Sequence, residues 1–120
     1  MSRPRFPRRL YARGSEPDAR VSLANERTFL AWITSGLGLL SAGVALESFA
    51  LALHPTFRLA AALTLIGGGM VCAVMGWLRW MRVEQALREG RPLPSTGAMA
   101  VLASVLAVAC LLVVGGLLAA

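Results

Sequence analysis

Three apolar runs divide the chain, over residues 28–53, 59–80 and 99–118. Each reaches the length of about 20 residues that a helix needs to cross a hydrocarbon core about 30 Å thick. Glu47 is the only ionisable side chain in the first run. The pattern therefore predicts an all-α integral membrane protein, with three transmembrane helices that form one domain over residues 19–120.

Arginines flank these runs unevenly, and their placement predicts the topology. All 12 basic residues are arginine, and the formal net charge is +6. They gather before the first run and at or after the end of the second, and only Arg58 lies between the two runs. By the positive-inside rule, the N-terminus and the second loop are cytoplasmic, whereas the first loop and the C-terminus lie outside. The mean hydropathy of +0.66 argues against a soluble domain.

The segment before the first span is short, basic and interrupted by Pro and Gly. This composition predicts a disordered cytoplasmic tail over residues 1–18. The tail lies beside a membrane whose anionic lipids attract arginine directly, so lipid headgroups are the expected partner and nucleic acid is not. Asp18 or Ser22 is expected to cap the helix that enters the first span.

Small residues recur at helical spacing in the first two spans. Faces of this kind let membrane helices approach closely. Three helices do not use all of these faces internally, so a homo-oligomer is the expected state, with packing inside one chain as the alternative. The small residues on these faces are Thr34, Gly38, Ala42, Gly36 and Gly43 in the first span, and Gly68, Cys72 and Gly76 in the second.

Charged and aromatic residues near the ends of the spans have ordinary structural interpretations. Glu47 is expected near the outer interface, as a solvated acid close to Arg58. Glu84 and Arg88 are expected to pair because they lie four residues apart on one helix, which Gly90 should end. The tryptophans near the arginines, Trp32, Trp77 and Trp80, are expected to be interfacial anchors.

A carboxylate and a guanidinium stand next to each other where the first span begins, in the sequence LANERTFLAW over residues 23–32. Charges at this depth are costly to leave unpaired. Glu26 and Arg27 are adjacent on a helix and point about 100° apart, so neither neutralises the other well. Each is therefore expected to need a partner from another helix, another subunit, a lipid or a ligand.

This decapeptide also carries a family resemblance, together with the glycine-rich helix that follows it, the stretch LRWMRVEQAL over residues 78–87, and the Gly/Pro loop before the last helix. The chain from Asp18 onward resembles the domain of unknown function 202 family, the small YidH-like inner-membrane proteins of bacteria. The resemblance implies a multi-pass protein of the bacterial inner membrane. The motif positions beside Glu26 and Arg27 are Asn25, Thr28, Phe29 and Trp32.

A similar domain forms the membrane part of the vacuolar transporter chaperone complex of eukaryotes, which makes and translocates polyphosphate. There, matching Glu and Arg positions line an oligomeric pore, and the resemblance carries these roles onto Glu26, Arg27 and Arg79. It implies a ring of five subunits and an anion such as polyphosphate as a ligand. One departure weakens a fixed anion path, because many YidH-like chains carry Arg two positions after the tryptophan, where this chain has Thr34.

Hairpin geometry adds a fourth candidate residue. The start of the first span should lie near the end of the second, which places Arg27, Arg79 and Arg82 in one cytoplasmic layer. Like charges at that depth repel unless an anion lies among them. Glu26 is expected to satisfy one of them, so these four residues are the predicted ligand-binding or pore-mouth site.

Enzymatic chemistry is not expected from this sequence. A single His and a few serines within the spans do not assemble a nucleophile, a base and an orienting acid. Cys72 and Cys110 are isolated and mid-span, so small packing residues are expected there, and no metal site or other cofactor is predicted.

Two functions remain. The first is an oligomeric channel or transporter component that handles an anion such as phosphate or polyphosphate. The second is a non-catalytic scaffold or assembly subunit that binds anionic lipid or a partner protein.

Overall fold

The computed structural model describes residues 5–49, 51–93 and 97–120, and four helices account for most of them. Three of the helices are long and apolar enough to cross a membrane. The described residues contain no strand. The predicted all-α fold with three spans is therefore confirmed, and its helices are α1 (Arg8–Tyr11), α2 (Ala19–Ser48), α3 (Pro55–Glu89) and α4 (Ala98–Leu118).

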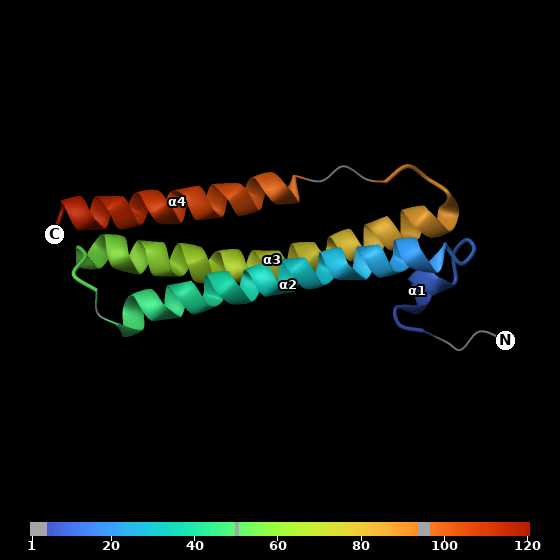
Figure 1. Ribbon diagram of the computed structural model, residues 1–120, viewed down its shortest axis with the longest axis horizontal. Helices are drawn as coiled ribbons and strands as arrows, with labels where there is room; N and C mark the ends of the chain where they lie inside the picture. Colours follow the sequence, from blue (N-terminus) through green and yellow to red (C-terminus); the bar gives the residue numbers. More distant parts are fainter. Residues whose placement is uncertain (1–4, 50, 94–96) are drawn as a thin grey trace.

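The three long helices lie side by side with α3 in the middle (Figure 1). Helices α2 and α3 form an antiparallel hairpin, and α4 packs along the other side of α3. The molecule measures 63 × 25 × 21 Å, so its long axis exceeds a hydrocarbon core of about 30 Å. The excess lies at the end that holds residues 5–27 and 79–93, called here the arginine-rich end. The C-terminus lies at the opposite end.

Local signals in the sequence set most helix boundaries. The Asp18 carboxylate caps α2 by accepting a hydrogen bond from the Arg20 amide at 2.8 Å. Gly90 ends α3 in the left-handed conformation, with φ of 66°, as expected. Helix α2, however, ends at Ser48, before the predicted limit of the first span at Leu53. Residues 51–53 lie outside the helices, and Leu53 is buried against Gly116 of α4.

Glycines bring α2 and α3 into close contact. A Cβ atom built on Gly36 would lie 3.0 Å from the carbonyl oxygen of Gly69, and one on Gly76 would lie 2.8 Å from the Cβ of Trp32. Trp32 is therefore buried, with 7% of its surface exposed. The prediction of an interfacial anchor is wrong for Trp32, because the space above Gly76 accommodates its ring between the helices.

Helix α4 is held against α3 at two levels. In the middle of the membrane, Val105 fills the space above Gly68. At the end near the C-terminus, Phe57 packs on Gly116, and the His54 amide donates to the Gly116 carbonyl at 3.1 Å. Much of the surface of α4 faces outward, and Cys110 lies on this exposed surface. The prediction of a buried packing cysteine is therefore wrong for Cys110 in the single chain, whereas it is confirmed for Cys72 of α3.

Candidate functional site at the arginine-rich end

A polar network is buried between α2 and α3 near the first turn of α2. The Glu84 carboxylate, on a residue only 4% exposed, accepts from the Ser22 hydroxyl at 2.9 Å and from the Asn25 amide nitrogen at 3.3 Å. The same amide group donates to the Trp80 carbonyl at 3.1 Å. The Asn25 side-chain oxygen is buried and has no hydrogen-bond partner among the described residues. This network ties the two helices together at a depth where unpaired polar groups are costly.

Arg88 forms a second cluster one turn beyond Glu84. Its side chain is 5% exposed and donates to the carbonyl oxygens of Tyr11 and Arg13, both at 2.9 Å. It also pairs with Glu16 at 3.2 Å. In return, the Ser15 amide donates to the Arg88 carbonyl at 3.0 Å. A buried guanidinium with its donors used in this way clamps the N-terminal segment onto the end of α3.

The N-terminal segment consequently differs from the predicted disordered tail. Residues 5–17 include the short helix α1 and fold back along the arginine-rich end, with Leu10 buried. The backbone reaches Arg88 through Gly14, whose φ is +59° and where a Cβ atom would collide with the Arg88 carbonyl oxygen. Composition missed this because the contacts are made by backbone groups of the tail and by a residue far along the chain. Residues 1–4 lie outside the described residues.

The predicted pairing of Glu84 with Arg88 is wrong. Each side chain is buried and has partners from elsewhere, Glu84 on α2 and Arg88 on the N-terminal segment. Spacing of four residues favours pairing only where both side chains are free to reach across the helix surface. By contrast, Glu47 and Arg58 do approach each other as expected, with 3.4 Å between their side chains.

The four predicted site residues do not form one cluster. Glu26 lines a hollow with Phe29, Trp77 and Trp80 on one side of the α2–α3 seam. Arg79 lines a separate groove with Asn25 and Thr28. Among the residues that the structure describes, the side chains of Glu26, Arg27, Arg79 and Arg82 make no hydrogen bond or ion pair. The predicted neutralisation of an arginine by Glu26 is therefore absent within the single chain.

The sequence analysis named Asn25 as a motif residue, but it did not identify the buried Glu84 and Arg88 as members of these networks. Asn25 and Glu84 lie at about equal sequence distances from the turn at His54, as partners in an antiparallel hairpin must. That symmetry, applied to Asn25, would have identified Glu84. Arg88 offered no comparable signal. In the described part of the chain, no group of three His, Cys, Asp or Glu residues is placed to hold a metal ion.

Replacing Glu84 by alanine should lower the free energy of unfolding by about 2 kcal/mol, because it leaves the Ser22 hydroxyl without its acceptor and Asn25 with one fewer. Unfolding in mixed micelles with increasing SDS, followed by circular dichroism, measures this. The matched control is Glu26→Ala, which removes an exposed carboxylate that makes no ion pair with any described residue and should change the free energy of unfolding in micelles by less than about 0.5 kcal/mol. Equal effects of the two substitutions would contradict a structural role for the network.

Fold and site together define the class of this protein, a small all-α membrane protein with three spans and polar networks at one end. Residues 20–86 match the family described as "Domain of unknown function (DUF202)", and the chain belongs to that family. The match covers α2 and most of α3, including Asn25 and Glu84 but not α4.

Similar proteins of two bacteria agree with this assignment. The chain is 46% identical over 105 residues to the inner membrane protein YidH of Escherichia coli K12, covering 85% of this chain and 90% of that protein. It is 45% identical over 80 residues to an uncharacterized protein of Mycobacterium tuberculosis, covering 66% of each. No solved structure matches. This is a YidH-like multi-pass protein of the bacterial inner membrane.

Proposed function

We propose that this protein is a subunit of an oligomeric channel or transporter component that draws an anion, such as phosphate or polyphosphate, to its arginine-rich end. The observation that carries the proposal is the face of α2 directed away from α3. At spacings of four and three residues this face bears an arginine followed by small or weakly polar side chains, all exposed: Arg27, Ala31, Thr34, Gly38 and Ser41.

The position of this face follows from helix geometry. Asn25, Trp32 and Gly36 are buried against α3, and Arg27 comes two residues after Asn25, which rotates it about 200° around the helix. The stripe offers little apolar surface to lipid, so it is suited to face another subunit or a hydrated lumen. Arg27 would lie at the mouth of such a lumen, where an unpaired guanidinium attracts an anion.

The orientation expected from the positive-inside rule favours an anion that arrives from the cytoplasm. The positive-inside rule places the arginine-rich end on that side. Arg79 and Arg82 lie at the same end without an ion-pair partner in the described part of the chain, and they add to the positive potential there. The net charge of +6 has the same sign.

Arg27→Ala should reduce phosphate or polyphosphate flux into proteoliposomes at least about tenfold, because it removes the charge that stabilises the anion at the mouth. The oligomer should stay intact, as judged by native mass spectrometry. Arg9→Ala is the matched control, since Arg9 is an exposed residue of α1 at the same end and makes no ion pair with any described residue. Unchanged flux in Arg27→Ala would remove the proposal.

A scaffold is the second candidate. It is favoured because Glu26 and Arg27 have no ion-pair partner among the described residues and point to different sides of α2. Charges placed in this way suit contacts between subunits, where they fix the register of neighbouring helices. In that case Glu26→Ala and Arg27→Ala would each dissociate the oligomer, and exchanging the two charges would partly restore it. An intact oligomer in both single variants would exclude this role.

A further inference from the structure

Glu26 stands at the edge of an aromatic box on the α2–α3 seam. The box is formed by the rings of Phe29, Trp77 and Trp80. The ring centroids of the two tryptophans lie 5.3 Å apart. The centroid of Phe29 lies 6.2 Å from that of Trp77 and 6.5 Å from that of Trp80. The hollow that these rings and Glu26 line also includes Leu30. Trp77 is stacked between Trp80 and Phe6, whose ring centroid lies 6.2 Å from that of Trp77, so the faces of Trp77 are partly covered and the residue keeps 36% of its surface exposed. The remaining ring surface lines the hollow beside the Glu26 carboxylate, and both attract positive charge, so the hollow is suited to an organic cation.

Among the described residues, no basic side chain forms an ion pair with this carboxylate. Arg5 lines an adjoining hollow that shares Glu26 and Trp80, but its guanidinium pairs with Glu16 and lies 4.1 Å from the centre of the Tyr11 ring. Arg27 is the next residue along α2 and points about 100° away from Glu26. Glu26 therefore keeps its negative charge available to a ligand at the rings.

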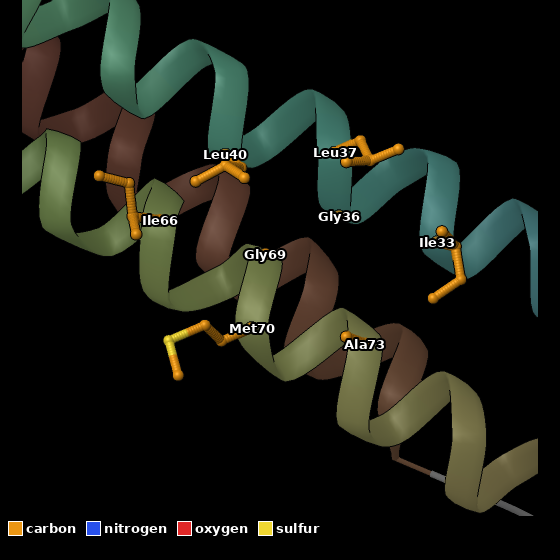
Figure 2. A pocket seen from close by; sticks show the side chains of 8 residues that line it. All are labelled: Ile33, Gly36, Leu37, Leu40, Ile66, Gly69, Met70 and Ala73. Atoms are coloured by element: carbon orange, nitrogen blue, oxygen red, sulfur yellow. The ribbon is translucent and has the colours of Figure 1, made fainter.

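An apolar groove lies between α2 and α3, nearer the middle of the two helices than the box (Figure 2). Figure 2 shows Ile33, Leu37 and Leu40 along α2 and Met70 and Ala73 along α3, with the close approach of Gly36 and Gly69 at its floor. Ile33 follows Phe29, and Ala73 precedes Trp77, by one helical turn each, so box and groove lie on the same side of the seam. Helix α4 lies behind the hairpin in this view and leaves the groove open.

The dimensions match one leaflet of a bilayer. From Phe29 to Leu40 helix α2 rises about 16 Å, and half of the hydrocarbon core is about 15 Å thick. A cationic headgroup in the box would place an acyl chain along the groove. A cation site followed by an apolar groove of this length fits a phospholipid, with its headgroup in the site and an acyl chain in the groove.

We propose that the box and groove bind a phospholipid with a primary ammonium headgroup, a phosphatidylethanolamine, with the ammonium between Glu26 and the rings and one acyl chain in the groove. A primary ammonium carries three hydrogen-bond donors for the Glu26 carboxylate as well as the charge that the rings attract. A choline headgroup has the charge without the donors and should bind more weakly. A glycerol headgroup has no cation and leaves the phosphate as the only charge, which Glu26 repels.

This site is separate from the anion function proposed above. Glu26 lies on the seam side of α2, whereas Arg27 lies on the face opposite α3. Loss of the lipid site is therefore expected to leave the oligomer in place, and loss of anion flux in Arg27→Ala would not affect lipid retention. The two proposals fail in different experiments.

The test uses the full chain in nanodiscs of equimolar phosphatidylethanolamine and phosphatidylglycerol with identical acyl chains. After extraction into mild detergent, mass spectrometry gives the ratio of the two lipids that remain bound. The native chain should enrich phosphatidylethanolamine about fivefold over the bulk mixture, and Glu26→Gln should return the ratio to the bulk value. Glu47→Gln, on the same helix but at the other end, should retain the enrichment.

Several outcomes would overturn the proposal. An unchanged ratio in Glu26→Gln would show that the carboxylate does not select the headgroup. Enrichment of phosphatidylglycerol would show that the arginines control lipid binding instead. A ratio equal to the bulk value in the native chain, with a cross-link between copies through Leu37→Cys, would assign the groove to a second copy of the chain.

A second variant, Trp77→Leu, changes an exposed ring and should weaken retention of both ethanolamine and choline lipids.

Discussion

Arg88→Ala should free the N-terminal segment from the end of α3 and expose it to trypsin. The substitution removes hydrogen bonds to the carbonyl oxygens of Tyr11 and Arg13 and an ion pair with Glu16. Bonds to a charged donor contribute about 1.5–3 kcal/mol each, so even a net loss of about 2 kcal/mol raises the open population about 30-fold. Cleavage after Arg13, followed by mass spectrometry of the purified protein in detergent, measures that change.

The control for this prediction is Arg91→Ala. Arg91 is an exposed residue just after α3, and it pairs with Glu89 at 2.7 Å rather than with the N-terminal segment. Its loss removes the same charge and should leave the rate of cleavage after Arg13 within about twofold of the native value. Equal rates in Arg88→Ala and the native chain would mean that the guanidinium does not hold the segment.

The sequence predicts helix α2 well and the docking of the segment before it poorly, and the reason is physical. Long apolar runs fix a transmembrane helix almost independently of their surroundings, because a backbone in lipid must satisfy its own hydrogen bonds. The spans, the cap at Asp18 and the stop at Gly90 follow from such local rules. The docking of residues 5–17 depends on one distant side chain, Arg88, and no local composition predicts that.

The candidate site was only partly predictable for a related reason. The hairpin places the start of α2 beside the end of α3, which the order of the spans already implies. Which side of the seam each residue occupies depends on the rotation of each helix about its axis, and that rotation is set by where Gly36, Gly69 and Gly76 allow close approach. Glu26 and Arg79 therefore lie in different hollows although both belong to the predicted layer.

The three consecutive glycines of α3, Gly67, Gly68 and Gly69, face three different surroundings: open space, α4 and α2. A Cβ atom on Gly67 would meet nothing within 4 Å, one on Gly68 would lie 2.5 Å from Val105 of α4, and one on Gly69 would lie 2.8 Å from the Gly36 carbonyl oxygen of α2. The three neighbours thus differ in what a methyl group would encounter, while their sequence context and depth are nearly the same. This makes the run an internal test of helix packing.

Gly69→Ala and Gly67→Ala should change the free energy of unfolding in opposite directions. A methyl group at position 69 meets backbone rather than a flexible side chain, so α2 and α3 must separate, which costs about 1–3 kcal/mol. At position 67 the methyl group enters open space and replaces a glycine in a helix, which is worth up to about 1 kcal/mol in favour of alanine. Unfolding with increasing SDS, followed by the fluorescence of Trp32, Trp77 and Trp80, gives the change in the free energy of unfolding for each substitution. Destabilisation of similar size by the two substitutions would show that the glycines matter for helix flexibility and not for the contact between Gly69 and Gly36.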